Sequence, residues 1–232
     1  DRVVGVTTFC DYPEEAKRLQ KIGGMSNPSL EAVVSLKPDI VVMTMDGNPK
    51  EFEERLRAFR IKTYVFRAKQ LQEFPQAVKD LGAAMGARER AERLAGEIEK
   101  TLNSFNDRSR ITHHASRKQG VLFIVWPEPL IVAGPGSIAD NAITILGEEN
   151  IAARSNTAYP KYSIEEILRS APDIIFIGSG TGMEEVSRGL LQRLKMVPAV
   201  KNGKVFYVGD YLYRLTPRTV KGLEELVRCL DK

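Results

Sequence analysis

The chain of 232 residues contains few of the residues that mark metal sites or disulfide-stapled folds. Its two cysteines, Cys10 and Cys229, form neither a CxxC pair nor a spacing typical of metal ligands, and a disulfide between them stays open from the sequence alone. The two histidines are adjacent and belong to no carboxylate cluster, so we expect no zinc or other metal site.

Long apolar runs are also missing. None approaches the roughly 18 residues that a membrane-spanning helix needs, and the first residues lack the charged start, apolar core and cleavage site of a signal peptide. Basic and acidic residues are nearly balanced, at 34 and 30, and are interleaved as on solvated helix faces. The densest basic stretch, residues 108–118, has no interleaved aromatic residues, so we expect an exposed connection and no nucleic-acid partner.

One pattern does occur twice. SLEAVVSLKPDIVV at 29–42 recurs as SIEEILRSAPDIIF at 163–176, and the serines and the Pro-Asp pairs are each 134 positions apart. In each copy a serine is suited to cap a helix, a glutamate suits the first turn, and the proline ends the helix before a β-branched run. The sequence therefore predicts two similar halves, with a cleft for a small molecule between them.

The spacing of apolar residues predicts alternating strands and helices in both halves. Strands are expected at 3–8, 39–44, 62–66, 120–125, 173–177 and 204–208, and helices at 14–20, 29–37, 49–59, 138–146, 163–170, 190–194 and 216–230. Residues 46–49 read as a turn. Residues 74–108 are helical throughout, as one long helix or two in tandem. This order predicts an α/β fold with mostly parallel sheets.

A glycine-rich turn follows one predicted strand. Gly178, Gly180 and Gly182 would suit a phosphate-binding turn before a helix, with Asp210 as a ribose-binding acid. The pattern is GxGxG rather than GxGxxG, and the acid is displaced relative to a dinucleotide site, so a plain βα turn is the preferred interpretation. A nucleotide-dependent enzyme remains the alternative, although no nucleophile, base or carboxylate dyad stands out and no catalytic residue is predicted.

Aromatic and charged residues follow several predicted strands. Asp210, Tyr211 and Arg214 lie between the last strand and the last helix, where they would either contact a ligand or form a surface ion pair. Other rings on loops at equivalent strand ends offer large contact area at low conformational cost. These are Phe9, Tyr12, Trp126 and Tyr159. Glu31 and Glu165, equivalent in the repeat, would either stabilise their own helices or dock on a two-fold partner that carries arginines.

Taken together, these segments resemble the substrate-binding proteins of ABC importers for cobalamin, haem and iron chelates, and the cobalamin-binding branch most. The matching segments are VGVTTFCDYP at 4–13, LKPD at 36–39, Gly47-Asn48, GEENI at 147–151, Tyr159-Pro160 and DYLYRLTPR at 210–218. The resemblance implies a helical-backbone periplasmic binding protein, with two α/β lobes of mostly parallel sheet joined by one long helix. Such a protein is not an enzyme and holds no cofactor.

By this resemblance, the corrinoid or chelate would contact Phe9, Tyr12, Met25, Trp126, Tyr159, Asp210, Tyr211 and Arg214. Glu31 and Glu165 would dock onto arginines of the permease dimer. Met25 and Thr44 stand where the cobalamin binder has tryptophans, so an iron siderophore or haem stays an alternative ligand.

The resemblance also implies a domain division and a location. The first lobe would comprise residues 1–73 without the strand and helix that begin other members, the linker helix and connection residues 74–117, and the second lobe residues 118–232. The protein would be periplasmic or extracytoplasmic, with lipid anchoring left open.

Overall fold

The structure is a computed structural model that describes residues 2–45, 49–113, 117–180 and 182–232. The predicted turn at 46–49 lies mostly outside the described residues, as do residues 114–116 of the basic stretch and Thr181 of the glycine-rich turn. The chain forms two compact units. Unit 1 comprises Asp1–Ala68 and Asp80–Ala87, and unit 2 comprises Lys69–Lys79 and Arg88–Lys232.

Unit 1 contains two pairs of parallel strands, β1 (Gly5–Val6) with β2 (Gln20–Lys21) and β3 (Ile40–Thr44) with β4 (Lys62–Phe66). The helices that connect them are η1 (Glu14–Arg18), α1 (Leu30–Ser35) and α2 (Lys50–Ala58). Burial of one apolar stripe from each of α1 and α2 against β3 forms the core of this unit. Its buried members are Val33, Met43, Phe52 and Leu56.

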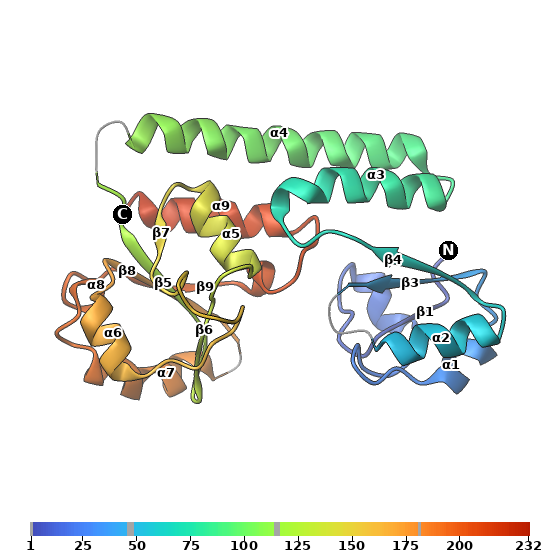
Figure 1. The fold of residues 1–232 in the computed structure, drawn as a ribbon, viewed down its shortest axis with the longest axis horizontal. Helices are drawn as coiled ribbons and strands as arrows, with labels where there is room; N and C mark the ends of the chain where they lie inside the picture. The colour runs from blue at the N-terminus through green and yellow to red at the C-terminus, as the bar shows by residue number, and fades with distance from the viewer. Residues whose placement is uncertain (1, 46–48, 114–116, 181) are drawn as a thin grey trace. The chain divides into compact units, whose positions relative to one another are not determined.

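The helical stretch after β4 consists of η2 (Leu71–Glu73), α3 (Phe74–Ala84) and α4 (Arg88–His113). The sequence left open one long helix or two in tandem, and the structure has two. Gly86 has a φ of +65°, which a glycine adopts without steric cost and which ends α3. The residues of α4 all belong to unit 2, where this helix packs on α5 and α9 (Figure 1).

Unit 2 is built on one sheet, with the order β6-β5-β8-β9 and with β7 also paired to β5. β5, β7, β8 and β9 are parallel, and β6 is antiparallel to β5. These strands are β5 (Gly120–Pro127), β6 (Leu130–Val132), β7 (Glu149–Asn150), β8 (Ile174–Gly178) and β9 (Val205–Val208). The helices are α5 (Ile138–Ile145), α6 (Ile164–Ser170), α7 (Met183–Arg193), α8 (Pro198–Lys201), η3 (Asp210–Leu212) and α9 (Thr219–Leu230).

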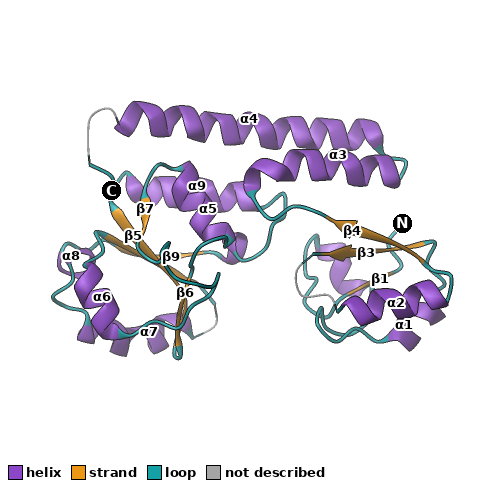
Figure 2. Ribbon diagram, in the orientation of Figure 1, coloured by secondary structure: helices purple, strands orange, loops and turns teal. Residues whose placement is uncertain are grey.

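Both faces of this sheet are covered by helices, α6, α7 and α8 on one face and α5 and α9 on the other (Figure 2). The side chains of β8 and of the first five residues of β5 are therefore buried on both faces, as expected for central parallel strands. On one face, three phenylalanines from β5, β8 and β9 are in register, and their ring centroids are 6.3 and 6.0 Å apart. These are Phe123, Phe176 and Phe206.

The sequence repeat is also a structural repeat. Ser29 and Ser163 each cap a helix through the side-chain oxygen, which accepts a bond from Ala32 N in α1 and from Glu166 N in α6, both at 3.2 Å. Each helix leads to a strand, β3 or β8. Lys37 and Ala171, which are also equivalent, both have left-handed φ values, of 48° and 45°.

The strand predicted at 3–8 has only two residues, and β2, β6 and β7 were not predicted. The helix predicted at 190–194 is wrong in extent, because α7 begins at Met183. The segment predicted as helix at 14–20 is a 3-10 helix, η1, that ends at Arg18.

Candidate ligand-binding site

Three loops of unit 2 leave the same edge of its sheet. β5, β8 and β9 are parallel, so their carboxyl ends lie on one side. Trp126 is the second-last residue of β5, Gly178 ends β8, and Asp210 follows β9 after one residue. Neighbouring strands are about 4.8 Å apart, so this edge measures about 10 Å from β5 to β9. Open parallel sheets bind ligands beyond these ends, which makes the edge the candidate site.

Tyr213 forms the base of this edge. Its hydroxyl donates to the carbonyl oxygen of Val125 at 3.1 Å, and its ring meets Phe123 edge to face, with centroids 6.3 Å apart. A β-carbon at Gly178 would collide with the phenol oxygen. Gly178 thus has a packing role that involves no phosphate. Burial raises the pKa of Tyr213 to about 12, with smaller contributions from Asp210 and Tyr159, so the phenol is neutral at physiological pH.

The segment after β9 presents a carboxylate and a guanidinium. Asp210 and Arg214 are exposed, and no ion pair joins them in the part of the chain that the structure describes. The predicted surface pair is therefore not formed. The Arg218 guanidinium lies 4.8 Å from the centroid of the Tyr211 ring, a cation–π arrangement. Thr219, fully buried, accepts from Thr216 N at 3.0 Å and donates to Arg214 O at 3.0 Å, which fixes this loop.

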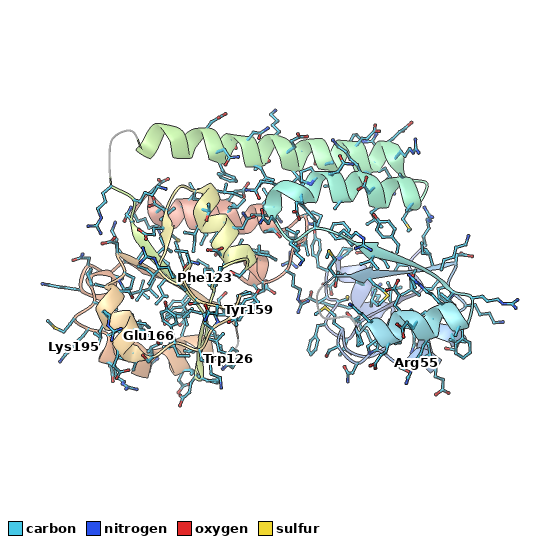
Figure 3. All side chains as sticks on the ribbon, viewed as in Figure 1. Arg55, Phe123, Trp126, Tyr159, Glu166 and Lys195 are labelled. Atoms are coloured by element: carbon cyan, nitrogen blue, oxygen red, sulfur yellow. The ribbon has the colours of Figure 1, made fainter. Side chains whose placement is uncertain are left out.

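Trp126 and Tyr159 are exposed rings of unit 2, each with 48% of its surface accessible (Figure 3). The Trp126 indole N–H donates to the carbonyl oxygen of Glu128 at 2.6 Å, which fixes the orientation of the ring. Tyr159 lies between two carbonyl groups, those of Ala158 and Pro160, which accept bonds from Gly134 N and from Val132 N at the end of β6. Ile131 of β6 pairs with Trp126 and also forms an isolated bridge with Lys161, so the segment around Tyr159 lies beside the carboxyl end of β5.

Unit 1 carries a second group of exposed apolar side chains. Phe9 and Tyr12 follow β1 and Met25 follows β2, and their exposed fractions are 71%, 61% and 46%. Because β1 and β2 are parallel, these residues share one strand edge. Lys21 holds the turn between Phe9 and Tyr12, because its ammonium donates to Cys10 O at 2.9 Å and also to Ala16 O at 3.1 Å.

Glu31 and Glu165 are exposed in the first turns of α1 and α6. Neither forms an ion pair among the described residues. The carboxylate of the adjacent Glu166, in contrast, accepts from Ser163 N at 2.6 Å in a capping box. Glu166 thus serves its own helix, whereas the structure gives no such partner to Glu165.

Both cysteines are free, and the described residues contain no group of three or more His, Cys, Asp or Glu side chains arranged to hold a metal ion. None of the described helices has the length and apolar character needed to cross a membrane.

The structure thus brings Trp126, Asp210 and the segment around Tyr159 to one edge of unit 2, together with the segment that holds Tyr211 and Arg214. It brings Phe9, Tyr12 and Met25 to one edge of unit 1. Tyr213 was not among the residues predicted from the sequence to contact a ligand, although it lies inside the segment 210–218. The available signal was a glycine at the end of a buried strand, which often marks a close approach by another group.

Comparison with known proteins agrees with this architecture. The family model for the periplasmic binding protein matches residues 1–212. A vitamin B12-binding protein of Pectobacterium atrosepticum is 25% identical over 229 residues, which cover 97% of this chain and 80% of that protein.

Two solved structures have the same fold. BtuF of Vibrio cholerae, a periplasmic vitamin B12 binding protein, matches with a TM-score of 0.84 at 25% identity and covers 98% of this chain and 88% of its own. RhuT from Roseiflexus sp. RS-1, a periplasmic haem-binding protein in its apo form, also matches with a TM-score of 0.84, at 28% identity, with coverage of 98% and 89%.

These matches confirm the family resemblance and the two-lobed α/β fold class that the sequence predicted. They also decide against a nucleotide-dependent enzyme, since proteins of this kind capture a solute and catalyse no reaction on it. The chain belongs to the periplasmic binding protein family.

Proposed function

We propose that this protein is the substrate-binding component of an ABC importer and that it captures cobalamin or a related corrinoid. The observation that carries the proposal is the carboxyl edge of the unit 2 sheet, where exposed aromatic rings share one edge with a carboxylate and a guanidinium. An edge of about 10 Å suits a large ring system with a polar periphery better than a single small metabolite.

Each group of residues has a role in this proposal. The rings of Trp126 and Tyr159 would pack on the apolar parts of the macrocycle, since flat rings bury large area at low conformational cost. Asp210 and Arg214 would bond to its peripheral amides. Tyr211 is held by Arg218 and would add a further ring. In unit 1, the exposed side chains of Phe9, Tyr12 and Met25 would contact the same class of ligand.

Haem or an iron siderophore is the second candidate ligand. Met25 and Thr44 stand where, by the resemblance, the cobalamin binder has tryptophans, and this difference favours the second candidate. The 28% identity to the haem-binding RhuT favours it as well. Haem iron needs an axial side chain, and tyrosine is one of the residues that supply it. Tyr12 and Tyr159 would be the candidates, with 61% and 48% of their surfaces exposed.

The family implies a periplasmic location, and the proposal covers both a free and a lipid-anchored protein. We also propose that Glu31 and Glu165 dock onto arginines of the permease dimer. What supports this is their equivalent placement, since each follows an N-cap serine by two residues and each is exposed. A pair of related acidic surfaces suits a two-fold partner with basic patches.

Calorimetric titration with cyanocobalamin, hemin and a ferric hydroxamate siderophore tests the ligand proposal. We expect one-to-one binding of cyanocobalamin with a negative heat-capacity change, because apolar surface is buried. Tighter binding of hemin, with a shifted Soret band, would select the second candidate. Absence of binding to all three by a well-folded protein would contradict both.

A further inference from the structure

We propose that Asn150 is a positioning residue for the ligand surface: with Asp140, it fixes the backbone that presents Tyr159. The inference rests on the proposed function, because Tyr159 is one of the proposed ligand contacts. Neither Asn150 nor Asp140 is itself among those contacts. Asn150 lies at the end of β7, and Asp140 lies in the first turn of α5.

The side chain of Asn150 is buried, at 5% exposure, and is fully engaged. Its amide nitrogen donates to Ala133 O at 3.0 Å and to Asp140 Oδ1 at 2.7 Å. Its amide oxygen accepts from Ala152 N at 3.0 Å. Both donors and the acceptor are thus satisfied, which allows a single orientation of the amide and fixes the carbonyl of Ala133.

Asp140 extends this fixation along the chain. Its second carboxylate oxygen accepts from Gly136 N at 3.0 Å. Its backbone N–H donates to Ser137 Oγ at 3.1 Å, and that hydroxyl donates to Gly134 O at 2.9 Å. The loop from 133 to 137 is therefore bonded at three of its backbone groups by the side chains of Asn150, Asp140 and Ser137.

Backbone hydrogen bonds join the start of this loop to the segment around Tyr159. Gly134 N donates to Ala158 O at 2.8 Å and Val132 N donates to Pro160 O at 3.1 Å, so Tyr159 lies between two anchored residues. A β-carbon at Gly134 would collide with the carbonyl oxygen of Thr157 and would lie 2.8 Å from Pro160 Cδ. Because the two segments touch without space between them, a shift of residues 133 and 134 must move Tyr159.

A second buried polar group in unit 2 provides the matched control. Ser187, fully buried in α7, shares a hydrogen bond of 2.6 Å with the hydroxyl of Tyr207 on β9. This pair links a helix to the sheet and has no bond to the 132–134 segment or to Tyr159. Ser187→Ala should therefore reduce stability as Asn150→Ala does, without affecting the proposed ligand surface.

Hydrogen exchange on the ligand-free protein is the first test. In Asn150→Ala, we expect the amides of Val132 and Gly134 to lose about tenfold or more of their protection, because the carbonyl of Ala133 loses its partner and the Asp140 carboxylate loses one of its two bonds. The amides of the central strand β8 should keep theirs, as should Val132 and Gly134 in Ser187→Ala. Unchanged protection of Val132 and Gly134 in Asn150→Ala would overturn the inference.

A double-mutant cycle on affinity for cyanocobalamin is the second test. We expect Asn150→Ala to weaken binding several-fold in the natural background and to have no further effect in a Tyr159→Ala background. A merely structural role would give equal losses in both backgrounds, and that result would overturn the inference. Should Asn150→Ala not fold, Asp140→Asn, which keeps one carbonyl acceptor, takes its place in both tests. A natural protein that binds no cyanocobalamin would refute the corrinoid proposal alone, because the exchange experiment decides the role of Asn150 without ligand.

Discussion

The phenol oxygen of Tyr213 occupies the space that a side chain at Gly178 would fill. Gly178 is the last residue of β8, and Tyr213 reaches it from the segment after η3 to donate its hydrogen bond to Val125 on β5. A single ring thus links the ends of two central strands. Tyr213 can occupy this position at the candidate site only because residue 178 has no β-carbon.

Gly178→Ala is therefore expected to destabilise the protein by about 1–3 kcal/mol, the usual cost of overpacking a filled site. Chemical denaturation followed by circular dichroism measures this change. Gly189→Ala is the matched control, because a β-carbon there meets nothing within 4 Å and the residue lies inside α7. It should stabilise by about 0.5–1 kcal/mol through helix propensity. Equal effects of the two substitutions would contradict the packing argument.

Tyr213→Phe should change how stability depends on pH. The pKa of Tyr213 is raised from 10.0 to about 12, so the folded state holds the phenolic proton more tightly than the unfolded state does. This stabilisation is fully present below pH 10 and is lost as the pH rises through 12. Its size is at most about 2 kcal/mol, since solvent screens a partly exposed group.

Comparison of urea denaturation at pH 8 and at pH 11.5 tests this linkage. At pH 8, Tyr213→Phe should cost about 1 kcal/mol for the lost hydrogen bond to Val125. That difference should shrink or reverse at the higher pH, because the natural protein has then lost most of the stabilisation that comes from the raised pKa of Tyr213. A difference that is constant between the two pH values would show that the phenol is not perturbed.

The elements that could be predicted from the sequence are those with local signals. Ser29 and Ser163 predict where two helices begin, because a cap involves residues only three apart. Pro38 and Pro172 predict where these helices end. β7, in contrast, is defined by the pairing of Gly120 with Glu149, which a local pattern does not reveal. Strands of two residues depend on tertiary neighbours and carry no periodicity of their own.

The candidate site divides in the same way. The positions of Trp126 and Asp210 at the carboxyl ends of β5 and β9 were predictable, because a ring and a charge stand at the ends of apolar, β-branched runs. Their contact with a ligand stays a prediction. The contact of Tyr213 with Gly178 joins residues 35 positions apart and depends on which strands are neighbours, so spacing alone did not predict it. The bonds of Asn150 were hidden for the same reason, since they join β7 to the start of α5.

Trp126→Ala is expected to weaken ligand binding by about tenfold or more, because a stacked ring at the centre of a binding surface typically contributes 2 kcal/mol or more. Trp126→Phe should recover part of the loss. Met196→Ala is the control, since Met196 is exposed at 73% but lies next to α8, outside the proposed surface. Calorimetry on the three variants measures the effect. A similar loss in Met196→Ala would argue against the proposed surface.

Charge reversal at Glu31 or Glu165 should weaken association with the permease while ligand binding persists. We expect Glu165→Lys to slow association and the effect to shrink at high salt, because exposed charges are screened within about 8 Å at physiological ionic strength. Glu166→Ala is the control: it removes the carboxylate that caps α6, so it should lose stability and keep association. Surface plasmon resonance with the permease in detergent measures association, and thermal unfolding measures stability. Equal loss of association in Glu166→Ala would indicate a helix defect instead of a docking contact.

The left-handed residues that end the two repeat helices offer a test of the repeat itself. Ala171 has a φ of 45°, a conformation that costs a residue with a β-carbon about 1–2 kcal/mol and a glycine almost nothing. Ala171→Gly should therefore raise stability by about 0.5–1 kcal/mol, after the greater freedom of glycine in the unfolded chain is subtracted. Lys37→Gly should do the same in unit 1, where φ is 48°. Arg169→Gly, inside α6, is the control and should instead lower stability by about 1 kcal/mol. Thermal unfolding measures the stability of these variants. An Ala171→Gly variant less stable than the natural protein would contradict the left-handed end of the helix.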